Sequence, residues 1–202
     1  MDGALIIHAA VEGIVDEAVA QKLIIEAGGN PGTVYGKIGK AFLHQKVQGF
    51  NNAAKTRPWL ILVDLDNDAE CAPPFCTRWV PDPAPYLCFR VAVRMVESWL
   101  MADAEALASF LGLRSNRIPR DPEQLDDPKR EMVNLARRSR RAAIRKDMAP
   151  REGSGRPVGP AYASRLIEYV QRSWRPDVAC RHAESLRRAI ACLRRVIEEV
   201  AT

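Results

Sequence analysis

Acidic side chains in the first half of the chain have the types and spacing of a divalent-cation site. Asp64 and Asp66 stand two residues apart directly after an apolar run, and Asp68 follows at the same spacing. Residues two apart on an extended segment project to the same side, so Asp64 and Asp66 are expected to converge on one ion. Mg²⁺ prefers such oxygen ligands, and the bound ion can polarise a phosphoryl group. The pattern predicts Mg²⁺ or Mn²⁺ ligands at Asp64, Asp66 and Asp68, against the alternative of a polar turn ending a strand.

Two glutamates are candidates to complete this site. Glu12 follows the apolar run Ala4–Ala10. Glu97 falls within the apolar stripe of a predicted helix, where a carboxylate is costly unless it is paired or bound to a metal. We predict a role in the site for both glutamates. The competing interpretation of Glu97 is an ion pair with Arg90 or Arg94. Asp103, at the edge of the same stripe, receives no assigned role.

The elements that must position these residues alternate along the first half of the chain. Helices are predicted at Asp16–Ala27, with Asp16 as its cap, at Ala41–Val47, and from about Val93 to Leu111, while Ala72–Pro85 reads as a Pro-rich loop. The predicted strands are Ala4–Ala10, Thr33–Tyr35, Trp59–Val63 and Leu87–Val93. Alternating strands and helices predict an α/β fold with a mainly parallel sheet of about four strands. Sites in such sheets form at the carboxyl ends of the strands, where the acidic residues fall.

The second half of the chain is predicted to be helical and is strongly basic. The net charge is −4 over residues 1–110 and +9 over residues 111–202. Helices are predicted at Glu131–Lys146, Ala161–Ser173 and Val178–Val200, with a loop at Glu152–Pro160. We therefore predict an α/β core at residues 1–112 and a basic helical extension, packed on that core, at residues 113–202.

The segment Lys129–Arg151 is a candidate surface for nucleic acid. It holds nine basic and two acidic residues. Lysine and arginine on one helix attract the phosphate backbone without reading sequence. The alternatives are an acidic partner or a solvated helix face. Lys37 and Lys40 do not fit a phosphate-binding loop and are expected to be solvated. The predicted backbone-binding residues are Arg137, Arg138, Arg140, Arg141, Arg145 and Lys146.

The composition limits the cellular location and the kinds of partner that the protein is expected to have. The 202 residues contain no apolar run of the roughly 18 residues that suggest a membrane span, and no basic segment precedes the first apolar run. Five cysteines without a CxxC pair favour reduced thiols. We expect a cytoplasmic protein without a membrane partner. An apolar stripe along the last predicted helix could pack on its own domain or form a homodimer seam.

Two motifs resemble those of the Toprim domain, which occurs in primases, topoisomerases and overcoming-lysogenization-defect-type nucleases. Val11-Glu12-Gly13, followed by Asp16 and a helix, resembles the first motif, and the strand ending in Asp64-Leu65-Asp66 resembles the Asp-x-Asp motif. The resemblance covers roughly residues 4–110. It implies a Mg²⁺-dependent phosphodiester site in which Glu12 is a general acid/base or a ligand and Asp64 and Asp66 are ligands.

The segment from Arg90 to Asp103 is similar to one in a family of small Toprim-like bacterial proteins. Members of that family are often encoded beside ATPases in mobile or phage-defence loci. The resemblance implies a metal-dependent nuclease or related phosphotransfer enzyme, with nucleic acid as substrate. Two alternatives stay open, a non-catalytic adaptor subunit of an ATPase and a nucleic-acid-binding module. No nucleophilic-tyrosine or primase accessory domain is found, which argues against topoisomerase and primase activities.

Overall fold

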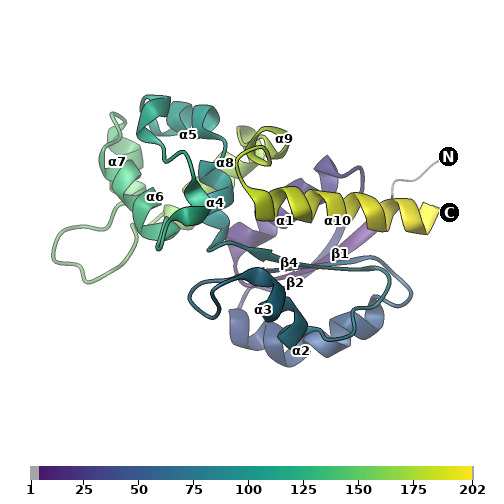
Figure 1. Ribbon diagram of the computed structural model, residues 1–202. Helices are drawn as coiled ribbons and strands as arrows, with labels where there is room; N and C mark the ends of the chain where they lie inside the picture. The colour runs from purple at the N-terminus through teal and green to yellow at the C-terminus, as the bar shows by residue number, and fades with distance from the viewer. Residues whose placement is uncertain (1–4, 202) are drawn as a thin grey trace.

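The computed structural model describes residues 5–201 and contains one four-stranded parallel sheet with helices on both faces (Figure 1). The strand order is β2-β1-β3-β4, and all three pairings are parallel. The strands are β1 (Ile6–Val11), β2 (Asn30–Gly36), β3 (Trp59–Asp64) and β4 (Leu87–Ala92). This confirms the predicted α/β class and all four predicted strands, although Ala4, the first residue of the predicted first strand, lies outside the described residues.

Alternating side chains of the strands enter two separate hydrophobic clusters. Leu60 and Leu62 of β3 face one cluster, and Ile61 and Val63 face the other. All of β3 is buried, as its continuous apolar sequence predicts for a central parallel strand. Helices α2 (Lys40–Ala53) and α3 (Ala72–Trp79) cover one face. Helices α1 (Ile14–Glu26) and α10 (Glu184–Ala201) cover the other (Figure 1).

The remaining helices form a lobe (Figure 1). Its main helices are α4 (Val96–Met101), α5 (Ala104–Leu111), α6 (Pro128–Arg137), α7 (Ala142–Met148), α8 (Tyr162–Arg172) and α9 (Pro176–Ala179). In this lobe α8 and α9 pack against α1, and α5, α6 and α7 lie farther from the sheet, at the left of Figure 1. Two short 3-10 turns, Ser115–Arg117 and Pro122–Gln124, link α5 to α6. One hydrophobic cluster runs from β1 to Val196 in α10, so residues after 112 share a core with the sheet.

Some helix boundaries differ from the sequence prediction for identifiable reasons. The predicted loop at Ala72–Pro85 contains α3, whose prolines stand in the first turn, where the missing N–H costs little. The predicted helix after β4 is interrupted at Asp103, which caps a new helix. The predicted basic helix is divided into α6 and α7 by Arg138–Arg141. The end of α1 at the two glycines is confirmed: Gly28 has φ 97° and Gly29 N donates to Ile24 O at 2.9 Å.

The apolar stripe of the last helix packs within the chain. Ala183, Leu186, Ile190 and Leu193 are buried, and α10 lies against β4. These side chains are therefore unavailable for a seam with a second copy. In the described part of the chain, no helix combines the length and apolar character needed to cross a bilayer.

Candidate functional site

The acidic residues gather at the carboxyl ends of β1 and β3 and at the start of α4. The backbone N–H of Asp64, the last residue of β3, donates to Glu12 Oε1 at 2.8 Å. Asp64 Oδ1 accepts a hydrogen bond from the N–H of Val96, the first residue of α4, at 2.9 Å. Parallel strands bring residues separated by 52 positions to one edge, as the sequence predicts for Glu12 and Asp64.

Asp16 belongs to this cluster and was missed as a candidate site residue. Gly13 is the N-cap of α1, so the prediction of Asp16 as the cap is wrong. Asp16 instead lies in the first turn with 7% of its surface exposed. Burial, and then the charges of Glu97 and Glu12, raise its pKa to about 7. The available signal was its position in the first helical turn after β1, at the edge of the sheet where Glu12 lies.

Glu97 is buried at 2% exposure, and its partners come from the helical lobe. Tyr162 Oη of α8 donates to Glu97 Oε1 at 3.1 Å, and Lys129 Nζ of α6 lies 3.9 Å from the same oxygen. The predicted alternative of a partner at Arg90 or Arg94 is therefore wrong. Arg94 donates to the carbonyl oxygen of Asp66 at 2.9 Å. The lobe thus supplies a cation and a hydroxyl to the acidic cluster.

Two carboxylate oxygens in the cluster are buried without a hydrogen-bond partner. They are Asp16 Oδ1 and Glu97 Oε2. Burial raises the pKa of Asp64 well above its usual range, and the charges of Asp16, Glu97 and Glu12 add to the shift. Burial also raises the pKa of Glu97, against the opposing charge of Lys129. Buried, mutually repelling carboxylates with unmatched oxygens are the donor set that a hard divalent cation would satisfy.

Asp66 and Asp68 share a different partner from Asp64. Lys40 Nζ, at the start of α2, lies 2.5 Å from Asp66 Oδ2 and 2.8 Å from Asp68 Oδ2. The expectation that Asp64 and Asp66 converge from an extended segment is wrong, because β3 ends at Asp64 and Asp66 has φ 49°. The prediction that Lys40 is solvated is also wrong, since its side chain is 20% exposed.

As the side chains stand, no three His, Cys, Asp or Glu residues among the described positions are arranged to hold a metal ion. The ion pairs and hydrogen bonds that these carboxylates already form explain the absence of such an arrangement. Asp66 and Asp68 neutralise Lys40, while Asp64 turns toward α4. The donor types of the cluster fit Mg²⁺ or Mn²⁺, but Asp66 would have to exchange the Lys40 ammonium for the ion. The metal ligands therefore stay a prediction.

The basic segment is exposed but is not a single helix face. Arg137 ends α6, and Arg145 and Lys146 lie in the last turn of α7. Arg141 and Arg145 each donate to a backbone carbonyl, to Phe110 O at 3.1 Å and to Ser139 O at 2.6 Å. All six predicted residues are exposed, namely Arg137, Arg138, Arg140, Arg141, Arg145 and Lys146. Binding of nucleic acid by them stays a prediction.

Asp103 is a structural residue of the lobe. It is fully buried and caps α5 by accepting from Ala106 N at 3.3 Å. Arg175 donates to both of its carboxylate oxygens, at 2.9 Å and 2.6 Å. This bidentate pair ties α5 to the start of α9.

We expect Asp103→Ala to lower the free energy of unfolding by about 2–3 kcal/mol, because a helix cap and buried charged hydrogen bonds are lost together. Urea unfolding followed by circular dichroism measures the change. Asp103→Asn retains the cap acceptor and should lose less. An unchanged urea midpoint in Asp103→Ala would contradict the structural role.

Comparison of the chain with protein-family models, with curated proteins and with solved structures finds no match in any of the three.

Proposed function

We propose that the protein is a Toprim-type, Mg²⁺- or Mn²⁺-dependent enzyme that cleaves phosphodiester bonds of nucleic acid. One observation carries the proposal: a cluster of buried acidic residues with two unmatched carboxylate oxygens lies at the carboxyl edge of a parallel sheet. Structural acidic residues are normally paired or solvated, so burial of several together requires a reason. A function that needs a cation at this edge supplies that reason.

Asp64 and Asp66 are the residues that would hold the ion, with Asp16 and Glu97 available to complete the oxygen donors. A bound divalent ion would polarise the phosphoryl group and neutralise charge that develops on it. Glu12, whose pKa is raised by burial, stands beside Asp64 and can hold a proton at its free oxygen. Asp68, half-exposed, lies at the rim of the site.

The two lysines at the site are suited to bind substrate phosphate. Lys40 faces Asp66 and Asp68, and Lys129 faces Glu97. Lys129 begins the basic segment predicted from the sequence, so that segment reaches the acidic cluster directly. A polyanion bound along α6 and α7 would therefore approach the carboxylates with its backbone charge neutralised.

The direct test incubates the pure protein with plasmid DNA or structured RNA, with Mg²⁺, with Mn²⁺ or with a chelator. Cleavage that depends on the ion is the expected result. Isothermal titration of the metal alone is run in parallel and is expected to show binding. Metal binding without cleavage would reject the enzyme for these substrates while retaining the metal site. Neither binding nor cleavage would reject both.

A further inference from the structure

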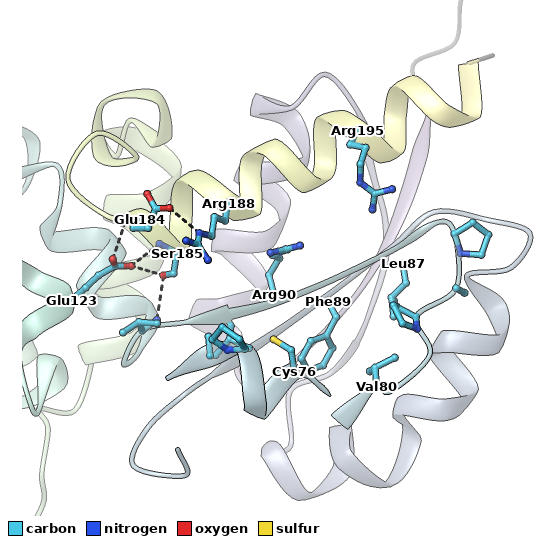
Figure 2. A pocket seen from close by; sticks show the side chains of 17 residues that line it. Cys76, Val80, Leu87, Phe89, Arg90, Glu123, Glu184, Ser185, Arg188 and Arg195 are labelled. Atoms are coloured by element: carbon cyan, nitrogen blue, oxygen red, sulfur yellow. Dashed lines mark hydrogen bonds and ion pairs between the residues drawn. The ribbon is translucent and has the colours of Figure 1, made fainter. Parts of the chain in front are cut away.

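A groove runs along the outer edge of the sheet, beside β4 (Figure 2). It has a volume of about 720 Å³ and lies between α3 and α10. Figure 2 shows Phe89 and Cys76 on the side of α3, and Arg90 directed toward α10. The groove is separate from the acidic cluster, since none of Glu12, Asp16, Asp64 and Glu97 lines it.

The floor of the groove is a strand edge that is open at Phe89 and Val91. At its two ends the N–H groups are already bonded, Leu87 N to Ala84 O and Val93 N to Ser185 Oγ. Tyr86 O accepts from Trp59 N at 3.0 Å and Ala92 O accepts from Leu65 N at 2.9 Å, so even-numbered residues near β4 face β3. In a parallel ladder the intervening residues turn their N–H and C=O groups to the opposite side. Phe89 and Val91 therefore direct their backbone groups into the groove. Among the described strands, none pairs with this edge.

The two walls of the groove differ in chemistry. Leu87, Phe89 and Val91, together with Val80 after α3, make the wall on the α3 side apolar. The wall on the α10 side carries three cations, Arg90, Arg188 and Arg195. The acidic residues of the groove are confined to one end. There Glu123 accepts from Glu184 N and Ser185 N, and Glu184 pairs with Arg188.

Arg90 stands out among these cations. Its Nε is buried without a hydrogen-bond partner, and no carboxylate within residues 5–201 forms an ion pair with it. Arg188 and Arg195 pair only with exposed glutamates on their own helix. The Arg90 guanidinium lies beside the thiols of Cys88 and Cys192, so an acidic side chain in the groove would give it the carboxylate partner that the described residues do not supply.

We infer that the groove binds an extended acidic peptide of a partner protein, which adds a fifth strand to the sheet beside β4. Added strands gain affinity from main-chain hydrogen bonds and specificity from alternate side chains. Because side chains of a strand alternate between faces, the ligand should alternate between acidic residues toward α10 and apolar residues toward α3. An unpaired edge at the base of a groove is protected from indiscriminate pairing by its two walls.

The experiment uses a fluorescent peptide of about seven residues in which Glu and Val alternate, a typical strand length. Fluorescence anisotropy should show saturable binding to the full chain. Two further peptides are N-methylated, one at every Glu and the other at every Val, so that each has the N–H groups of one strand edge blocked. Strand addition predicts that the peptide blocked on the edge facing β4 binds at least about tenfold more weakly. A Lys–Val peptide has the wrong charge and is expected to bind at least about tenfold more weakly as well. Arg90→Gln and Arg188→Gln should weaken binding, whereas Arg194→Gln, an exposed α10 position outside the groove, should not.

Equal binding of the unmodified peptide and of both N-methylated peptides would overturn strand addition, and this test needs no protein variant. Equal binding of the Lys–Val peptide would overturn the acidic ligand. Sedimentation of the protein alone detects the other occupant, a second copy paired through β4. A dimer that the Glu–Val peptide fails to dissociate would overturn the inference. Asp66→Asn should bind the peptide normally, so failure of the proposed enzyme and failure of this inference are distinguishable.

Discussion

Asp66→Asn should reduce the proposed metal-dependent cleavage by about 100- to 1000-fold, because it removes the negative charge of a proposed ligand and with it several kcal/mol of transition-state stabilisation. Asparagine is the replacement because of the backbone conformation at position 66. Asp66 has φ 49°, a conformation that asparagine tolerates far better than alanine. Its side chain is about one-third exposed, so the fold is expected to survive. Initial rates of plasmid or RNA cleavage at saturating Mg²⁺ measure the loss.

Matched variants distinguish the loss of a metal ligand from the loss of a negative charge elsewhere on the protein. Asp82→Asn removes an exposed carboxylate outside the site and should leave the rate unchanged. Asp68→Asn removes the other partner of Lys40 and, from the rim, should cost less than Asp66→Asn. A rate for Asp66→Asn equal to that of Asp82→Asn would exclude Asp66 as a ligand.

Asp16→Asn is expected to stabilise the metal-free protein at pH 8 by about 2–4 kcal/mol. The pKa of Asp16 is raised from 3.8 to about 7 in the folded protein. Between these values the folded state binds the proton and the unfolded state does not. Stability therefore falls as pH rises through this window, and the full cost is present above pH 7. The raised pKa values of Asp64, Glu97 and Glu12 act in the same direction.

Urea unfolding at several pH values between 5 and 8 tests this prediction. The wild type should lose stability across that range, and Asp16→Asn should lose less. Glu17→Gln provides the matched control, because it removes an acid from the same helical turn but outside the buried cluster. Added Mg²⁺ should stabilise the wild type more than Asp16→Asn at pH 8. A pH profile identical in the two proteins would contradict the buried charge of Asp16.

The fold was largely predictable because its signals are local. The run Trp59–Val63 is continuously apolar and forms the central strand β3. Helix boundaries were missed where one residue acts through tertiary contacts. Asp103 interrupts a helical pattern because Arg175, 72 positions later, stabilises it as a cap. No local pattern reveals such a partner.

The site was only partly predictable for the same reason. Glu12 and Glu97 come after β1 and β4, Asp64 is the last residue of β3, and the topology of a parallel sheet brings the three together. Lys40 and Lys129 could not be assigned, because each reaches the site from a separate helix through side-chain length. The convergence of Asp64 and Asp66 was predicted from the two-residue alternation of an extended segment. The left-handed conformation of Asp66 breaks that alternation.

The packing of α10 against β4 has a consequence for the order of events during synthesis. Cys88 of β4 and Ala189 of α10 are in contact although 101 positions separate them. The sheet face beneath α10 stays uncovered until residues 184–201 have left the ribosome. Contacts of such long sequence separation form late and slowly. Nascent chains that stall before residue 184 should therefore be clients of chaperones, whereas chains in which residues 184–201 have emerged should not.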